Sequence, residues 1–264
     1  MIFEFDIPTM NILSTSTDLR ESTVEFSGIP ETMGHTIGNG LRRTLLTNIP
    51  GIAPIAYTLL GSEGEFTEVA GFVNNTTEMA LKLKNIKVAA VGPDGIYGED
   101  TLPGFLLLSL NKRYENEFIK FGDFEVDSSQ GDTESRISIL NPDEELTYVG
   151  KERTVGLKLL LWTGVGYATY DEISKGYENE VRNYLGNNAI FLDSDFSPIE
   201  RVIYEVEEDT PSKGLETLRI TVTTNGSLPA VTSISHASAI LSSTFFILQR
   251  LTSIVLKPYT VSVE

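Results

Sequence analysis

Apolar side chains in residues 31–46 follow a helical period: they recur at a spacing of four, at Met33, Ile37, Leu41 and Leu45. The pattern predicts a helix with one apolar stripe and Thr32 as its N-cap. Gly38 and Gly40 lie inside this helix, where each costs about 1 kcal/mol relative to alanine. We expect that cost to be offset by the close approach of another backbone.

A second helical pattern covers the end of the chain. Ser227, Leu228 and Pro229 follow an Asn-Gly pair and resemble a helix start, with Pro229 at or near the first helical position. The segment 237–256 is the most apolar long stretch, but it carries Gln249, Arg250 and several serines, so it is read as a buried helix and not as a membrane span. The apolar positions that define its period are Ile234, Ala237, Leu241, Phe245, Leu248 and Val255.

Between these helices the pattern changes to short apolar runs separated by turn residues. Residues 137–139 and 156–162 are typical of strands, and residues 201–207 and 218–224 alternate apolar and polar side chains. The sequence therefore predicts an α+β fold. It consists of a discontinuous domain, residues 1–51 and 169–264, into which a β-rich domain, residues 52–168, is inserted.

The charge of the chain limits its partners. Its 20 basic and 37 acidic residues give a net charge of −17, which argues against broad direct contact with a nucleic-acid backbone. The acidity suits a partner with basic patches or serves only solubility, and both interpretations remain open. The chain has no cysteine, and its first residues lack the pattern of a signal peptide, so we expect a cytoplasmic protein.

No pattern in the chain predicts a catalytic centre. Residues 164–169 begin like a dinucleotide fingerprint but lack its third glycine, and residues 193–197 begin like a calcium loop but are followed by Pro198 where that loop needs glycine. His35 and His236 fall on the two predicted helices and are interpreted as packing residues. We predict no catalytic residue, no cofactor and no metal ligand in this chain.

The first helix is instead typical of a docking element. Arg42 and Arg43 extend from its second half in an otherwise acidic protein. The helix is therefore apolar and closely packed on one side and cationic on another. The alternative is that both arginines belong to an ordinary solvated helix face.

Residues 34–43 read Gly-His-Thr-Ile-Gly-Asn-Gly-Leu-Arg-Arg. This segment resembles the Gly-His-Thr-Leu-Gly-Asn-Ala-Leu-Arg-Arg pattern in the first helix of the α subunit of bacterial-type DNA-directed RNA polymerase. Four further segments resemble that family's amino-terminal region, in the same order along the chain: residues 65–84, 164–167, 196–206 and 218–226.

The resemblance implies a dimer in which the first and last helices pack against those of a second α-like chain. We expect a homodimer, although pairing with a divergent homologue remains open. The same apolar stripes could also fill the core of a single protomer. The residues that the resemblance assigns to the dimer interface are Ile37, Gly38, Leu41, Leu45, Ile234, Leu241, Phe245 and Leu248.

The resemblance also implies that the dimer is the platform on which β-like and β′-like subunits assemble. Arg43 corresponds to an arginine that grips β, with Arg42 and Leu46 beside it, and Lys84 corresponds to a lysine implicated in contact with a large subunit. Phosphodiester formation and the Mg²⁺ ion are expected in the large subunits.

Relatives commonly continue into a carboxy-terminal DNA-binding domain, and nothing after Leu256 is expected to form one. We therefore expect little direct DNA contact and no membrane contact. The cytoplasm, a plastid stroma or the cytoplasm of an infected cell are all compatible locations. The alternative function is a free-standing α-like module that binds polymerase subunits as a regulator or decoy, and a hydrolase or transferase acting alone is a third.

Overall fold

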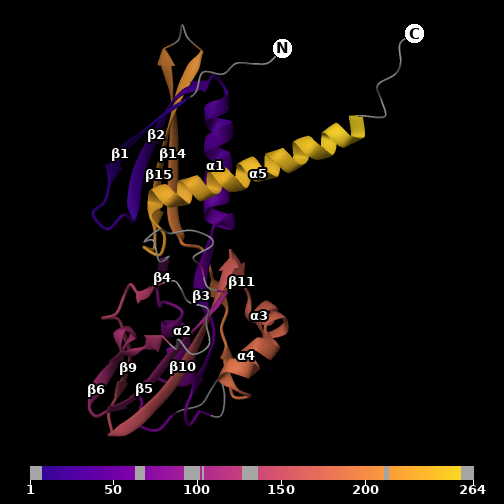
Figure 1. The fold of residues 1–264 in the computed structure, drawn as a ribbon. Coiled ribbons are helices and arrows are strands. Elements are labelled where there is room, and N and C mark those ends of the chain that lie inside the picture. The colour runs from indigo at the N-terminus through magenta and orange to yellow at the C-terminus, as the bar shows by residue number, and fades with distance from the viewer. Residues whose placement is uncertain are drawn as a thin grey trace. The chain divides into compact units, whose positions relative to one another are not determined.

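The computed structural model describes residues 8–62, 69–91, 102, 104–126, 136–210 and 214–256. The chain forms two compact units (Figure 1). Unit 1 comprises Met1–Ile49, Ile199–Thr224 and Pro229–Glu264, and unit 2 comprises Pro50–Pro198 and Asn225–Leu228. The mixture of helices and strands confirms the α+β class expected from the sequence.

Unit 1 is built on a four-stranded antiparallel sheet with the strand order β1-β2-β15-β14. Its strands are β1 (Thr9–Thr15), β2 (Glu21–Pro30), β14 (Ile199–Thr210) and β15 (Leu215–Thr224). One face buries Val24, Ile220 and Val222. The other face is polar: Arg219 bonds to Glu25 there. The alternation of side chains along each strand thus separates a core face from a solvent face.

Helix α1 (Met33–Asn48) packs closely on the core face of this sheet. A Cβ atom on Gly38 would lie 2.6 Å from the ring of Tyr204, whereas one on Gly40 would lie 3.7 Å from Leu241. The expected approach of another backbone is therefore not what the glycines accommodate: Gly38 makes room for side chains of the unit 1 sheet, and Gly40 has only an ordinary contact. Thr32 precedes the helix as expected, but its side chain makes no capping hydrogen bond.

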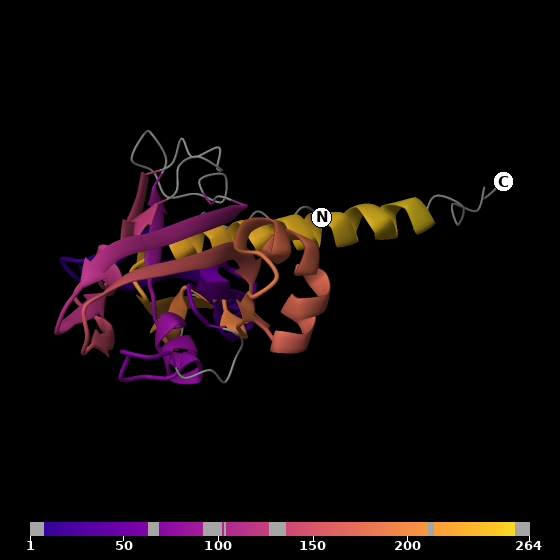
Figure 2. The ribbon, with the colours of Figure 1, turned by 90° about the horizontal axis from the view of Figure 1, so that it is seen from below.

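Helix α5 (Ala230–Leu256) begins at the predicted position and packs on α1 and on the sheet only with its first half. Figures 1 and 2 both show its second half extending free of the rest of unit 1. The expectation that residues 237–256 are buried is wrong for this half, because the large apolar side chains from Phe245 to Leu251 are exposed. Among the described residues, Ala230–Thr252 is one helix whose length and mean hydropathy of 1.4 would allow it to cross a membrane.

Unit 2 contains a five-stranded sheet with the order β12-β3-β10-β5-β7, covered on both faces. Its central strands are β3 (Pro50–Leu59), β10 (Arg153–Val165) and β5 (Phe105–Tyr114). One face packs against α2 (Thr76–Leu83) and several short strands. The other packs against α3 (Tyr170–Gly176) and α4 (Glu178–Leu185). The remaining elements are β4 (Val88–Val91), β6 (Glu117–Lys120), the 3₁₀ helix η2 (Phe121–Asp123), β7 (Glu125–Val126), β8 (Arg136–Ile139), β9 (Glu145–Val149), β11 (Tyr167–Ala168), β12 (Ile190–Phe191) and β13 (Ser194–Asp195).

The boundary between the units differs from the one drawn on the sequence. The sequence pattern predicts that residues 169–198 belong with the first and last helices. In the structure, Ile173 of α3 and Val181 of α4 are buried against Ile55 and Leu160 of the five-stranded sheet. Residues 169–198 therefore belong to unit 2.

Candidate functional site

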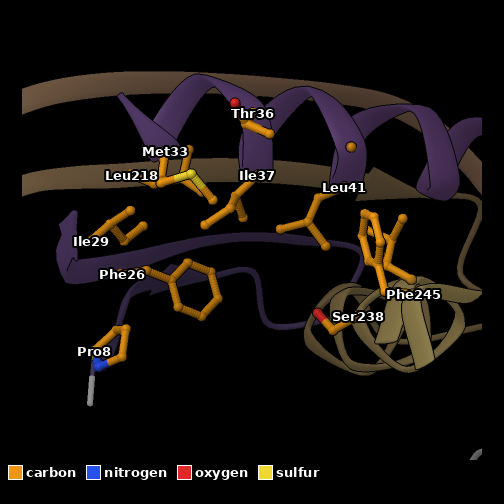
Figure 3. Close-up of a pocket in the computed structure, with 12 residues that line it drawn as sticks. Pro8, Phe26, Ile29, Met33, Thr36, Ile37, Leu41, Leu218, Ser238 and Phe245 are labelled. Carbon is orange, nitrogen blue, oxygen red and sulfur yellow. The ribbon is translucent and has the colours of Figure 1, made fainter. Parts of the chain in front are cut away.

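An apolar groove lies between α1, α5 and the sheet of unit 1. Its volume is about 400 Å³. Figure 3 shows side chains from all three elements pointing into it: Ile37 and Leu41 from α1, Phe26 from β2 and Phe245 from α5. The full lining is Pro8, Phe26, Ile29, Met33, Thr36, Ile37, Gly40, Leu41, Leu218, Ser238, Leu241 and Phe245.

The second half of α5 continues this apolar surface beyond the groove. Phe245 at the edge of the groove is 65% exposed, and Leu248 one turn later is 52% exposed. Phe246 and Ile247 are exposed as well. Four consecutive residues of a helix point in four directions about 100° apart, so this segment is apolar around most of its circumference. Such a surface marks a site of interaction with another protein or with a membrane.

The predicted interface residues fall into two groups. Gly38, Leu41, Leu45 and Ile234 are buried within unit 1 itself. In contrast, Ile37 and Leu241 are half-buried in the groove, and Phe245 and Leu248 are exposed. The first group fills the core of the protomer, which is the alternative given above for the apolar stripes. The second group has surface available for a partner.

The two arginines of α1 are exposed. Within the described part of the chain, neither the Arg42 nor the Arg43 guanidinium forms an ion pair. Arg219 differs, since it bonds to both Glu25 and Glu207. Leu46 is half-buried one turn from Arg42. This face of α1 can therefore offer two planar donors to carboxylates of another chain.

Lys84 lies in unit 2, where its ammonium group forms an ion pair with Asp193. The hydroxyl of Tyr167 donates to the other oxygen of the same carboxylate. Burial alone would raise the pKa of Asp193, but the hydrogen bonds from Lys84 and Tyr167 outweigh burial and hold that pKa below its usual value. Asp193 thus joins the C-cap residue of α2 to β11.

The residues that suggested enzyme motifs have other roles. Asp193 is bound to Lys84, and Asp195 accepts a hydrogen bond from the backbone of Ser197, so the segment that resembles a calcium loop is held as a turn. His35 is exposed, with its ring edge-on to Tyr204. In the part of the chain that the structure describes, no group of three or more His, Cys, Asp or Glu side chains could hold a metal ion.

Several residues of this surface were not identified from the sequence. Phe26, Ile29 and Met33 line the groove, but only tertiary structure brings them together. Phe246 and Ile247 could have been recognised, because a run of large apolar residues at 245–248 exceeds one helix face.

Comparison with known proteins finds relatives along most of the chain. A family model described as the RNA polymerase Rpb3/Rpb11 dimerisation domain matches residues 30–245. The chain is 28% identical over 240 residues to the DNA-directed RNA polymerase subunit alpha of Mycoplasma mycoides subsp. mycoides, covering 90% of this chain and 70% of that protein. It is 30% identical over 218 residues to the subunit of the same name from Aster yellows witches'-broom phytoplasma, covering 83% of this chain.

A third relative, the DNA-directed RNA polymerase subunit alpha of Maridesulfovibrio salexigens, is 30% identical over 210 residues. The chain spans 59% of the phytoplasma protein and 54% of the Maridesulfovibrio protein. The family match includes all of α1 and α5 as far as Phe245. It therefore contains all of α1 and the part of α5 that lines the apolar groove.

Proposed function

Because the chain belongs to the family of RNA polymerase Rpb3/Rpb11 dimerisation domains, we propose that it is a non-catalytic α-like subunit of a multisubunit DNA-directed RNA polymerase. In this proposal it dimerises and forms the platform on which β-like and β′-like subunits assemble for transcription. It acts where the polymerase acts, in the cytoplasm or an equivalent compartment.

One observation carries the proposal: unit 1 has both an open apolar groove and an exposed apolar helix end. The groove-lining residues of α1 and α5 lie within the segment matched to a dimerisation family, and the exposed end of α5 continues directly from it. In a dimer with two-fold symmetry the same surface occurs on both copies, so each copy can offer its α5 while receiving the partner's α5. Burying one large aromatic or aliphatic side chain contributes about 1.5–3 kcal/mol. Burial of Phe245 and Leu248 on both copies is therefore expected to contribute several kcal/mol to dimer stability.

The cationic face of α1 supports the second part of the proposal. Arg42 and Arg43 are exposed beside Leu46, a combination that suits contact with a carboxylate-bearing surface of a β-like subunit. Lys84 contributes differently, through its ion pair with Asp193. Catalysis and Mg²⁺ belong to the large subunits in this proposal, and the net charge of −17 disfavours direct contact of this chain with DNA.

The proposal is tested by purifying the tagged chain from its native source and identifying the associated proteins by mass spectrometry. We expect β-like and β′-like subunits in a 2:1:1 ratio with this chain, and promoter-independent RNA synthesis by the purified complex. Recovery of a polymerase that already contains another α pair would instead support the regulator or decoy, and recovery of the chain alone would contradict assembly.

The contribution of α1 is tested by Arg43→Ala in the same purification. We expect the variant to remain dimeric but to lose most of the β-like subunit, because the partner's carboxylate is left unpaired. Arg182→Ala is the matched control, since Arg182 is an exposed arginine on α4 of unit 2. Equal yields of β-like subunit from the two variants would remove Arg43 from the proposed contact.

A further inference from the structure

The first turn of α1 is held by a carboxylate from another element. Glu216 of β15 is 7% exposed. Its Oε1 accepts a hydrogen bond from the backbone N–H of Thr32 at 2.9 Å, and its Oε2 accepts one from the backbone N–H of Gly34 at 2.7 Å. The leading N–H groups of a helix have no partner within the helix. One side chain, from a residue 182 positions away in sequence, therefore satisfies two of them.

The local residues around this carboxylate are arranged for it. A Cβ atom on Gly34 would lie 2.6 Å from Glu216 Oε2 and 2.7 Å from Val206, so only glycine lets the backbone come this close. Thr32 has φ 72°, a left-handed conformation that is costly for a β-branched residue. Such a conformation persists when its surroundings impose it, and the two hydrogen bonds to Glu216 are contacts that can do so.

The electrostatic environment points the same way. Among the described residues, no lysine or arginine forms an ion pair with Glu216. A buried carboxylate without a cation is costly. The positive end of the dipole of α1, with its free N–H groups, supplies the compensating charge. The carboxylate and the start of α1 thus stabilise each other.

We propose that Glu216 is the positioning residue of the assembly surface: it fixes where α1 begins and so the place at which α1 presents Ile37 to the groove and Arg43 to a large subunit. Arg43 follows Gly34 by about 14 Å along the helix axis. Because the helix is rigid, a shift in the position at which α1 begins also shifts Arg43. The link to assembly rests on the function proposed above, whereas the link to α1 does not.

The proposal is tested first on the isolated full chain by hydrogen exchange of the amides at the start of α1. Glu216→Gln keeps the volume of the side chain but removes its charge and one of its acceptor oxygens. We expect the amides of Thr32 and Gly34 to exchange about tenfold faster or more, because charge-assisted hydrogen bonds are lost. Glu208→Gln is the matched control, since Glu208 is exposed and lies opposite Glu216 in β14.

A second variant keeps the test decisive if Glu216→Gln folds poorly. Glycine adopts the left-handed conformation without strain and keeps the backbone N–H. We therefore expect Thr32→Gly to raise Tm in the wild-type background. In a folded Glu216→Gln background the gain should disappear, because Thr32 is then free to relax. Unchanged exchange in Glu216→Gln, or no rise in Tm for Thr32→Gly in the wild-type chain, would overturn the role of Glu216.

Assembly is the last readout. We expect Glu216→Gln to reduce the recovery of β-like subunit severalfold relative to Glu208→Gln. Accelerated exchange with unchanged recovery would overturn the link between the start of α1 and assembly. Unchanged recovery with Arg43→Ala as well would instead locate the failure in the proposed function of α1.

Discussion

Unit 2 and unit 1 are each built on an antiparallel sheet, but the faces of the two sheets are covered to different extents. The five-stranded sheet of unit 2 is buried on both faces, by α2 and short strands on one side and by α3 and α4 on the other. The sheet of unit 1 has α1 and half of α5 on one face, an open groove between them, and a polar second face.

The difference indicates where each unit obtains its stability. The core of unit 2 is completed by its own side chains, so its free energy of unfolding should not depend on protein concentration. Unit 1 leaves Phe245, Leu248 and Leu251 exposed on one helix end, so we expect association that buries them to add to its stability. A ligand or partner that binds only the folded state raises the apparent stability with its concentration. We therefore expect two thermal transitions, of which only that of unit 1 moves with concentration.

The largest expected effect tests the closed core of unit 2. Leu108 is fully buried in the central strand β5. Leu108→Ala should lower the free energy of unfolding of unit 2 by about 2–5 kcal/mol, because it leaves a cavity. Calorimetry at several protein concentrations should give the same loss each time. Leu81→Ala on α2, where the side chain is 59% exposed, should change the stability of unit 2 much less.

The next effect tests the open surface of unit 1. Phe245→Asp places a charge where we propose that the partner packs, and should weaken dimerisation by about 2–4 kcal/mol, the range of interface hot spots. Analytical ultracentrifugation measures the change. Leu81→Asp introduces the same charge at an exposed leucine of unit 2 and should leave the dimer unchanged. Equal dimerisation by both variants would mean that α5 is not the contact.

The regular parts of unit 1 could be predicted from the sequence. Met33, Ile37, Leu41 and Leu45 lie on α1 as their period indicated, and residues 201–207 and 218–224 lie in β14 and β15. These elements are specified by local periodicity, which the chain carries in full. The period did not, however, separate side chains that face the protomer core from those left for a partner, because both kinds of burial select the same residue types.

The features that could not be predicted depend on contacts between distant residues. Nothing local indicates that Glu216 reaches the backbone of Thr32, or that Lys84 pairs with Asp193. The placement of residues 169–198 was missed for the same reason: the short helices α3 and α4 have apolar residues, but only the sheet of unit 2 determines which core they enter.

A smaller effect distinguishes the two glycines of α1. A Cβ atom on Gly38 would lie 2.6 Å from the Tyr204 ring, so Gly38→Ala should destabilise unit 1 by about 1–3 kcal/mol through overpacking. A Cβ atom on Gly40 would make an ordinary contact at 3.7 Å with Leu241, so Gly40→Ala should stabilise α1 by up to about 1 kcal/mol. Denaturant unfolding of the two variants measures both. Destabilisation by both would indicate that Gly40 faces a close partner in the dimer.

The smallest effect concerns the ion pair of Lys84 and Asp193 in unit 2. The pKa of Asp193 is lowered from its ordinary value of 3.8 in the folded chain, so the pair stabilises the fold at higher pH. This stabilisation is complete above the unfolded pKa and is lost as the pH falls through the lower folded pKa. Because the pair is partly exposed, we expect it to contribute only about 0.2–1 kcal/mol to the free energy of unfolding.

Asp193→Asn should remove this contribution and its acid dependence, measured by denaturant unfolding of unit 2 between pH 7 and about pH 3. Asp143→Asn, at an exposed aspartate, should retain it. Since the pair lies within unit 2, the stability lost in Asp193→Asn should be the same at every protein concentration. A loss that changes with protein concentration would place Lys84 at an interface and contradict the closed character of unit 2.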